Sequence, residues 1–375
     1  AIDAKSGATS ATTATSSGTF STIVATAAGH RIDVKATDNA NRSSTRTIGA
    51  VPFVTTQRND AAVIAGDSAF RARRVAADGL NWIATNGTVD GAHMNGGSSR
   101  ALLFRQPDAS SPPAITAFDT TVGTVEDVAL QGAFAYVTGD RFATIDIVAA
   151  TPTIQLTTSR PCGRELALVV AGNFAFGAES GCANNGTIDI YDVSNPAAPL
   201  YVRQQAVGGA TTINYRALLA YGTQYLIAIT PDKPGGAGRD VTVIDRSDTN
   251  NLRKIAELDV PAFDAVSGLI DGTTLYLAGG DSGIAIVDLS NPAAPAWIST
   301  TDAPCIARSI VVTRPNEIAV ADAGGPGLTF LDTSDRMRPI VLGSQPFDGN
   351  ANDVKLSGGR LFVATETRSY VVIRP

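Results

Sequence analysis

The sequence has little charge, few aromatic side chains and almost no histidine. Charged residues account for 17% and aromatic residues for 6% of its 375 positions, and two residues are histidine. The formal net charge of -6 excludes a basic nucleic-acid-binding protein, so we expect no nucleic-acid partner. No apolar run approaches the roughly 20 residues that a membrane-spanning helix needs, so we expect no membrane span in this chain. The 36 glycines and 19 prolines disfavour long helices.

Sequence motifs of catalysis are missing as well. The chain contains no P-loop, no Cys-x-x-Cys pair, no His-x-x-x-His pair and no serine nucleophile elbow. The adjacent loop residues His93 and Met94 are too few to hold a transition metal. We therefore predict no catalytic residue, no metal site and no cofactor. Ca²⁺ is left open because the turn from Asp38 to Asn41 is rich in side-chain oxygens, although such turns usually hydrogen-bond internally.

The main feature of the sequence is an internal repeat. The segments GTIDIYDVSNPAAPLYVRQ from Gly186 and SGIAIVDLSNPAAPAWIST from Ser282 are near copies, and segments from Arg239 and Pro326 follow the same plan. The last residues of the central apolar strands lie 42 to 44 positions apart, with one interval of 53. These marker residues are Arg105, Val148, Asp192, Asp245, Asp288, Asp332 and Arg374. A repeat of this length predicts stacked copies of one structural unit.

Each repeat predicts four short strands that form one antiparallel sheet. In the segment DLSNPAAP, which separates the third strand from the fourth, Asp288 and Asn291 are expected to accept hydrogen bonds from nearby backbone amides. Pro295 then keeps the first amide of the next strand out of the sheet. A sheet of this size cannot bury both of its faces alone, so the units must pack against one another.

The two ends of the chain predict a closed ring. Six marker strands are followed by a fourth strand, which in most cases begins near a proline, whereas the seventh ends the chain. The segment VPFVTTQ, residues 51–57, has the same proline pattern and precedes the first unit. We predict that it completes the last sheet and removes the open edge of the ring. The predicted fold is all-β: a seven-bladed β-propeller of four-stranded antiparallel blades over residues 51–375.

The segments IAIVDLSNPAAP and IDIYDVSNPAAP resemble the LVIVD repeat, a bacterial β-propeller repeat found in surface and secreted proteins. The resemblance extends over roughly residues 60 to 375. Three copies are degenerate, with Arg105, Val148 and Arg374 in place of the marker aspartate. The resemblance implies a seven-bladed ring and an exported protein, and it does not imply a reaction.

Residues 1–50 do not fit the repeat and are predicted to form a separate module with strands at residues 20–26, 31–36 and 44–48. They resemble the closing half of a bacterial immunoglobulin-like domain, a partial β-sandwich. The matching positions are Gly18, Phe20, Gly29, Ile32, Val34, Ala36, Asp38 and Asn41. A lone sheet leaves one face in water. Either earlier residues of a longer protein or a neighbouring molecule complete the sandwich, or the segment is a loose terminal arm.

The cysteines predict one cross-link. Cys162 and Cys182 flank a predicted hairpin whose turn falls at Gly172, so they should face each other across paired strands. We predict a disulfide and hence an oxidising compartment, the alternative being two reduced, buried thiols. Cys305 has no evident partner and is expected to be a small buried hydrophobic residue.

One set of polar residues is a candidate ligand-binding site. The innermost strand of each predicted blade begins at a charged residue, and these residues should lie near one mouth of the central tunnel. They are Arg74, Asp127, Glu165, Arg216, Asp264, Arg308 and Asp353. Their mixed signs can bind a small zwitterion, a carboxylate or a cation. The alternative is that they pair with one another and with water to satisfy a partly buried channel.

These features predict a non-catalytic interaction or structural module. We expect it to be exported to the cell surface, the extracellular medium or the periplasm, and to act in adhesion, surface assembly or partner binding through its loop face. The expected partners are proteins or carbohydrates at the cell surface, or copies of the chain itself. Two alternatives are a propeller enzyme that uses the tunnel ring, such as a lactonase-like hydrolase or an oxidoreductase, and a subunit of an extracellular filament or surface layer. Because the chain begins at Ala1 without a signal peptide, we expect a mature form or a fragment.

Overall fold

The computed structural model describes most of the chain from residue 62 onward. The described ranges are residues 2–3, 31–37, 43–50, 62–67, 72–79, 81–85, 100–105, 114–157, 163–180, 186–207, 214–231, 239–301, 306–325, 327–367 and 369–373. Every regular element within these ranges is a β-strand, which confirms the predicted all-β class. Within the same ranges, no helix is long and apolar enough to cross a membrane.

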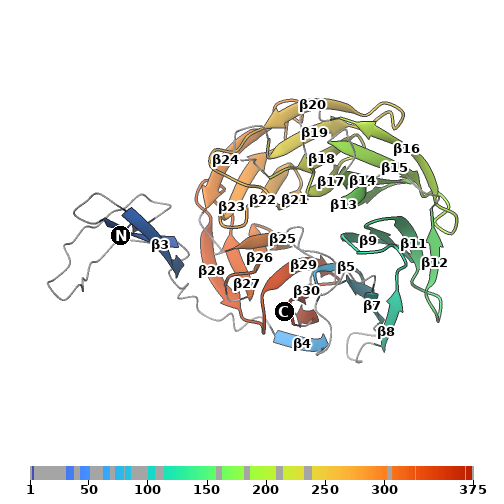
Figure 1. Ribbon diagram of the computed structural model, residues 1–375, viewed down its shortest axis with the longest axis horizontal. Helices are drawn as coiled ribbons and strands as arrows, with labels where there is room; N and C mark the ends of the chain where they lie inside the picture. Colours follow the sequence, from blue (N-terminus) through green and yellow to red (C-terminus); the bar gives the residue numbers. More distant parts are fainter. Residues whose placement is uncertain are drawn as a thin grey trace.

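The strands form four-stranded antiparallel sheets around a central axis, which is the architecture of a β-propeller (Figure 1). Six sheets are blades of four consecutive strands, and we name each blade after its first strand. The β5 blade contains β5 (Arg74–Asp78), β6 (Asn81–Thr85), β7 (Arg100–Arg105) and β8 (Ala114–Asp119). The β9 blade contains β9 (Asp127–Gln131), β10 (Phe134–Thr138), β11 (Phe142–Asp146) and β12 (Thr153–Leu156). The β13 blade contains β13 (Arg164–Ala171), β14 (Phe174–Ser180), β15 (Thr187–Asp192) and β16 (Leu200–Ala206).

The remaining three contiguous blades follow the same order. The β17 blade contains β17 (Ala217–Tyr221), β18 (Tyr225–Ile229), β19 (Val241–Asp245) and β20 (Arg253–Leu258). The β21 blade contains β21 (Ser267–Asp271), β22 (Thr274–Ala278), β23 (Ile284–Asp288) and β24 (Ala296–Thr301). The β25 blade contains β25 (Ala307–Arg314), β26 (Glu317–Asp322), β27 (Gly327–Asp332) and β28 (Ile340–Gln345). The first strand of each blade lies nearest the axis and contacts the first strands of both neighbouring sheets.

The remaining four-stranded sheet is composite and joins segments from distant parts of the chain. It consists of β29 (Ala351–Ser357), β30 (Arg360–Thr365), β31 (Ser369–Ile373) and β4 (Ala62–Asp67). β4 pairs antiparallel with β31, with Gly66 opposite Tyr370. The structure thus has six contiguous blades, and the predicted number of seven is reached only when this composite sheet is counted.

The predicted closing strand was wrong in position. Residues 62–67 close the composite sheet, whereas the segment 51–57 lies outside the described residues. Connection lengths explain the error. In the contiguous blades, the next inner strand begins 6 to 11 positions after the outer strand ends. β4 ends seven positions before β5 begins, whereas a strand that ended at Gln57 would lie 17 positions away. The proline near the start of most outer strands is absent from β4, so spacing identifies the closing strand better than the proline does.

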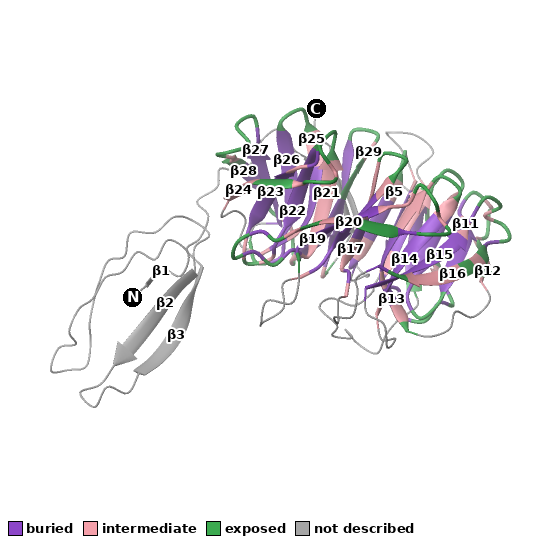
Figure 2. Ribbon diagram, turned by 90° about the horizontal axis from the view of Figure 1, so that it is seen from above, coloured by how far each residue is buried: buried purple, intermediate pink, exposed green. Residues whose placement is uncertain are grey.

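Hydrophobic cores lie between neighbouring sheets. Each cluster of buried apolar residues combines side chains of two adjacent sheets. Where the composite sheet meets the β5 blade, the ring centroid of Trp82 lies 4.6 Å from that of Phe104 and 4.9 Å from that of Phe362. The amide of Ala72 also donates to the carbonyl of Thr365 at 2.9 Å. Buried residues run through the blades and exposed residues gather at the turns (Figure 2), so the blades depend on each other for burial.

The turn between the third and fourth strands has the predicted hydrogen bonds. The Asp288 carboxylate accepts the amide of Ser290 at 2.8 Å, and the Asn291 side chain accepts the amide of Ala293 at 3.2 Å. Ser299 of β24 donates its hydroxyl to the carbonyl of Arg336, in the corresponding turn of the next blade, at 2.5 Å. Turns of this kind are therefore stabilised by hydrogen bonds within their own blade and, at Arg336, also by the preceding blade.

In the β9 blade, the sequence suggested that Val148 replaces the aspartate of this turn, but the structure has an aspartate there. Asp146 ends β11, and its Oδ1 accepts the amides of Val148 at 2.9 Å and Ala149 at 3.1 Å. The marker residue of the β9 blade is therefore Asp146, and the assignment to Val148 was wrong. The degenerate sequence IDIVAATP shifted the expected strand end by two positions.

Three short strands precede the propeller: β1 (Ile2–Asp3), β2 (Arg31–Thr37) and β3 (Ser43–Ala50). They form one antiparallel sheet in the order β1-β2-β3. β2 and β3 correspond to two of the three strands expected from the sequence. The expected strand at residues 20–26 lies outside the described residues. This sheet alone does not show an immunoglobulin-like sandwich.

Candidate functional site

Two cavities lie along the axis of the propeller. The first has a volume of about 490 Å³ and is lined mainly where the inner strands begin. The second has a volume of about 410 Å³ and is lined mainly by the inner strands themselves. Arg74, Arg216 and Val266 line both cavities. The two cavities are therefore neighbouring parts of one axial channel, and these three residues form its waist.

The predicted ring residues divide between the two cavities. Asp264 and Arg308 line the first cavity, Asp127 and Asp353 line the second, and Arg74 and Arg216 line both. Glu165 lines neither. The prediction that all seven residues meet at one mouth of the tunnel was therefore wrong, although six of them do face the axial channel.

Glu165 is buried inside its blade. Its side chain is fully inaccessible to solvent and accepts a hydrogen bond from the Tyr191 hydroxyl. A Cβ at Gly177, on the neighbouring strand, would lie 2.4 Å from the Glu165 carboxyl carbon, so the glycine leaves the space that this carboxylate occupies. The flanking residues Arg164 and Leu166 line the first cavity instead. Successive residues of a strand face opposite sides, so an error of one position moves the side chain from the channel to the core.

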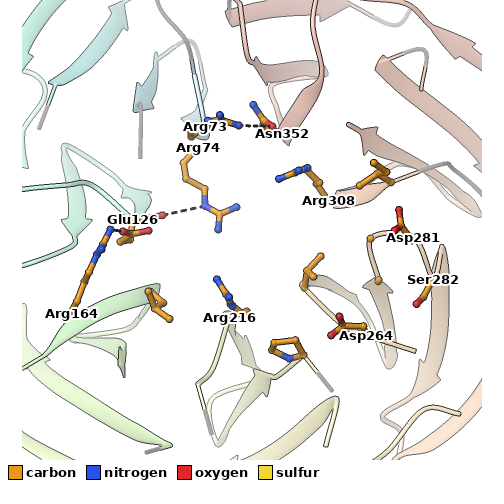
Figure 3. A pocket seen from close by; sticks show the side chains of 16 residues that line it. Arg73, Arg74, Glu126, Arg164, Arg216, Asp264, Asp281, Ser282, Arg308 and Asn352 are labelled. Carbon is orange, nitrogen blue, oxygen red and sulfur yellow. Dashed lines mark hydrogen bonds and ion pairs between the residues drawn. The ribbon is translucent and has the colours of Figure 1, made fainter. Parts of the chain in front are cut away.

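Arginine side chains converge in the first cavity. Figure 3 shows Arg74, Arg216 and Arg308 extending toward the same open space from the β5, β17 and β25 blades. Arg74 is held in place because its Nε donates to the carbonyl of Glu126 at 3.2 Å and lies 3.8 Å from the Asp127 carboxylate. Both terminal nitrogens of Arg74 lack a hydrogen-bond partner within the described part of the chain.

Two further arginines of this cavity are neutralised by the protein. Arg164 forms an ion pair with Glu126. Arg73 lies 3.5 Å from the Glu366 carboxylate and donates to the Asn352 side chain at 3.2 Å. These two arginines therefore form part of the wall.

Arg216 differs from the other arginines of the cavity. Its backbone amide donates to the carbonyl of Ile229 at 2.7 Å, which fixes the start of the inner strand. Its half-buried guanidinium makes no hydrogen bond or ion pair with any residue that the structure describes. A partly desolvated guanidinium with unused donors is a strong binding group for a carboxylate or phosphate.

Acidic residues of the second cavity connect neighbouring sheets. Asp127 accepts the amide of Leu168, in the next blade, at 2.9 Å. Asp353 accepts the amide of Val75 at 3.1 Å and the Ser309 hydroxyl at 2.7 Å, and so joins three sheets. Burial raises the pKa of Asp127, although the charge of Arg74 partly opposes this shift. These contacts support the structural alternative for Asp127 and Asp353.

The charges of the channel are unevenly distributed. Residues that line the first cavity alone include three arginines and three acidic residues, which balance. Residues that line the second cavity alone include two aspartates and Lys355, whose Nζ lies 3.3 Å from Asp353. The positive excess is therefore at the waist, where Arg74 and Arg216 line both cavities. In a chain of net charge -6, the waist is therefore a local region of positive charge, which favours an anion over a cation.

Several lining residues were missed by the sequence reasoning. They are Arg73, Glu126, Arg164, Asp281, Ser282 and Asn352. Four of them immediately precede a residue that was predicted, because the predicted starts of the inner strands lie within three residues of the observed ones. Asp281 and Ser282 lie between β22 and β23, and no pattern in the sequence distinguishes that turn from others.

The remaining candidate groups are the cysteines, the loop residues His93 and Met94, and one turn rich in side-chain oxygens. Cys162, Cys182 and Cys305 lie outside the described residues, as do His93, Met94 and the turn from Asp38 to Asn41. Among the described side chains, no three of His, Cys, Asp or Glu are grouped to hold a metal ion. The disulfide and the open question of Ca²⁺ stay predictions.

Comparison with known proteins supports the assignment of the chain to the β-propellers. The fold is that of a β-propeller with four-stranded antiparallel blades. Four of its segments, residues 122–153, 165–204, 266–302 and 348–373, match the family model of the LVIVD repeat. The second and third matches include the two near copies that the sequence revealed. No protein among the curated ones matches the chain.

Solved structures with the same architecture are distant in sequence. The chain is 10% identical to the WD40 β-propeller domain of Doa1, with a TM-score of 0.60 and coverage of 86% of this chain and 98% of that one. It is 13% identical to a chain in a crystal structure of the mitotic checkpoint complex, with a TM-score of 0.61 and coverage of 86% and 97%. At these identities the similarity shows the fold alone.

Proposed function

We propose that the protein is a non-catalytic interaction module that binds an acidic group of its partner in the axial channel. The observation on which this rests is the waist of the channel, where Arg216 has unused donors and Arg74 presents two free nitrogens to the same space. Binding through the loop face and the axial channel is consistent with other rigid folds, whose binding residues commonly lie on loops and in concave pockets.

The exported location and the use of the module in adhesion or surface assembly stay part of this proposal. Similarity to the LVIVD repeat, which is found in surface and secreted proteins, supports them. A cell-surface protein or carbohydrate with carboxylate, sulfate or phosphate groups would supply the anion. The immunoglobulin-like origin of the amino-terminal sheet is likewise a proposal, supported by the pairing of β2 with β3.

Ligand-observed NMR with sodium acetate tests the binding site. We expect line broadening of the acetate methyl signal in the presence of the protein at low ionic strength, and weaker broadening as salt is added. Arg216→Gln should weaken acetate binding by about tenfold or more, since a hydrogen bond to a charged group contributes about 1.5 to 3 kcal/mol.

A matched variant controls for the loss of one positive charge. Arg253 lies on the outer strand β20, is 62% exposed and pairs with Asp245 at 2.6 Å. Arg253→Gln should leave acetate binding unchanged, because Arg253 lies in neither cavity. Equal broadening by the wild-type protein and by Arg216→Gln would show that the anion does not bind at the waist.

A further inference from the structure

The walls of the second cavity differ from those of the first. Beyond the waist, partly exposed apolar side chains of the inner strands line the channel. These include Ala77, Ala129, Leu130, Val169, Val170 and Leu219. Val266, which lines both cavities, extends this apolar surface to the level of the two waist arginines. A molecule bound by its acidic group at the waist can therefore place an apolar body in the second cavity.

The acidic residues of the second cavity restrict the charge of the ligand. Asp127 and Asp353 accept backbone amides of neighbouring sheets, so they cannot turn away without breaking those bonds. A second negative group on the ligand would lie near both carboxylates. Repulsion between like charges therefore favours a ligand with one acidic group at its end.

We infer that the ligand of the channel is an organic acid with an apolar body, whose carboxylate binds between Arg74 and Arg216 and whose body lies in the second cavity. This inference rests on the proposed function and specifies its ligand class. The volume of about 410 Å³ is within the range of small-molecule binding pockets. A free acid with an alkyl or aryl body and the carboxyl terminus of an apolar peptide share this chemistry.

A homologous series of acids tests the inference. Acetate, butanoate, hexanoate and octanoate are titrated below their micellar concentrations and compared by ligand-observed NMR or calorimetry. Affinity should rise by about two- to fourfold per methylene group, the upper value corresponding to complete burial of each group. Octylamine and 1-octanol, which lack the carboxylate, should bind at least tenfold more weakly than octanoate.

Two variants separate the head of the ligand from its body. Arg216→Gln should weaken every acid in the series by a similar factor and leave the increase per methylene unchanged. Val170→Thr keeps the volume of the side chain but adds a hydroxyl in the second cavity, so it should reduce the increase per methylene while acetate binds as before. Melting temperatures of the free variants establish that both are folded.

The outcomes distinguish the inference from the function on which it rests. If acetate binds but affinity does not change with chain length, the inference is wrong and the anion site stands. If no carboxylate binds, both are wrong. A tetrapeptide of alanine and leucine with a free carboxyl terminus, compared with its amidated form, identifies the source of the carboxylate. If the free peptide binds more tightly than octanoate, the ligand is a protein terminus. If it binds more weakly, the ligand is a free acid.

Discussion

Replacing Asp353 with asparagine should destabilise the ring by a predictable amount. Oδ2 of Asp353 accepts the amide of Val75, while Oδ1 accepts the Ser309 hydroxyl and the amide of Val354 at 2.9 Å. An asparagine can keep only one of these two acceptor sites. If its oxygen faces Ser309, its NH₂ group faces the Val75 amide, and a buried donor is left without an acceptor.

The expected cost follows from that single donor. Val75 is 1% exposed, so water cannot replace the lost acceptor. An unsatisfied buried donor costs about 1 to 3 kcal/mol. At about 2 °C per kcal/mol for a domain of this size, the melting temperature should fall by about 2 to 6 °C. Lys355 adds little to this value because its side chain is 46% exposed.

Differential scanning calorimetry of three proteins measures the effect. Asp353→Asn is compared with the wild type and with Asp271→Asn, which changes an exposed aspartate at the end of β21. Asp271→Asn should leave the melting temperature unchanged. If Asp353→Asn also leaves it unchanged, Asp353 does not connect the sheets in the way that its hydrogen bonds indicate.

Three further predictions concern pH, cross-linking and closure. Four turn aspartates, Asp192, Asp245, Asp288 and Asp332, accept hydrogen bonds from the amide and hydroxyl of the serine two positions later, which lower their pKa below 3.8. The stability that these aspartates contribute is complete above that pH and is lost as pH falls through the lowered pKa. Asp127, whose pKa is raised, has the opposite effect. Melting temperature measured across this range should therefore decrease on acidification, and less steeply in Ser290→Ala. Cys162 and Cys182 each lie two residues beyond the paired residues Arg164 and Ser180, so peptide mapping without reductant should find them linked, and a free thiol at either position in the native protein would contradict this. A chain that starts at residue 58 should melt like the full propeller, whereas one that starts at residue 68 lacks β4 and should melt at a lower temperature; the reverse order of loss would restore residues 51–57 as the closing strand.

The repeat made the propeller predictable, because copies of one sheet must pack in the same way. The hydrogen bonds of Asp288 and Asn291 could also be predicted, since they depend only on neighbouring residues. The closing strand could not be identified by its proline, because β4 contains none and is held by its pairing with β31. A pairing between distant segments leaves little trace in local sequence.

Most charged residues of the candidate site were predictable to within one residue, but the cavity that each one lines was not. Which side of an inner strand faces the axis depends on register, and the pairing of β13 with β14 shifts between Glu165 and Ala167. Glu165 is buried in the core whereas its neighbours Arg164 and Leu166 line the channel, and the sequence gives no signal of this register. Arg216 was identified because it lies where an inner strand was predicted to begin, but its lack of a partner among the described residues is a property of the folded ring alone.

The distribution of charge argues for a small ligand over a polyanion. At a distance, a chain of net charge -6 repels a polyanion, and salt screens this repulsion beyond about 10 Å. At the waist, Arg74 and Arg216 attract one anionic group over a much shorter distance, where the low-dielectric walls strengthen the interaction. A monoacid meets little long-range repulsion and satisfies both arginines, whereas each additional negative group adds repulsion from Asp127 and Asp353. The same residues that connect the sheets thus limit which anions the channel accepts.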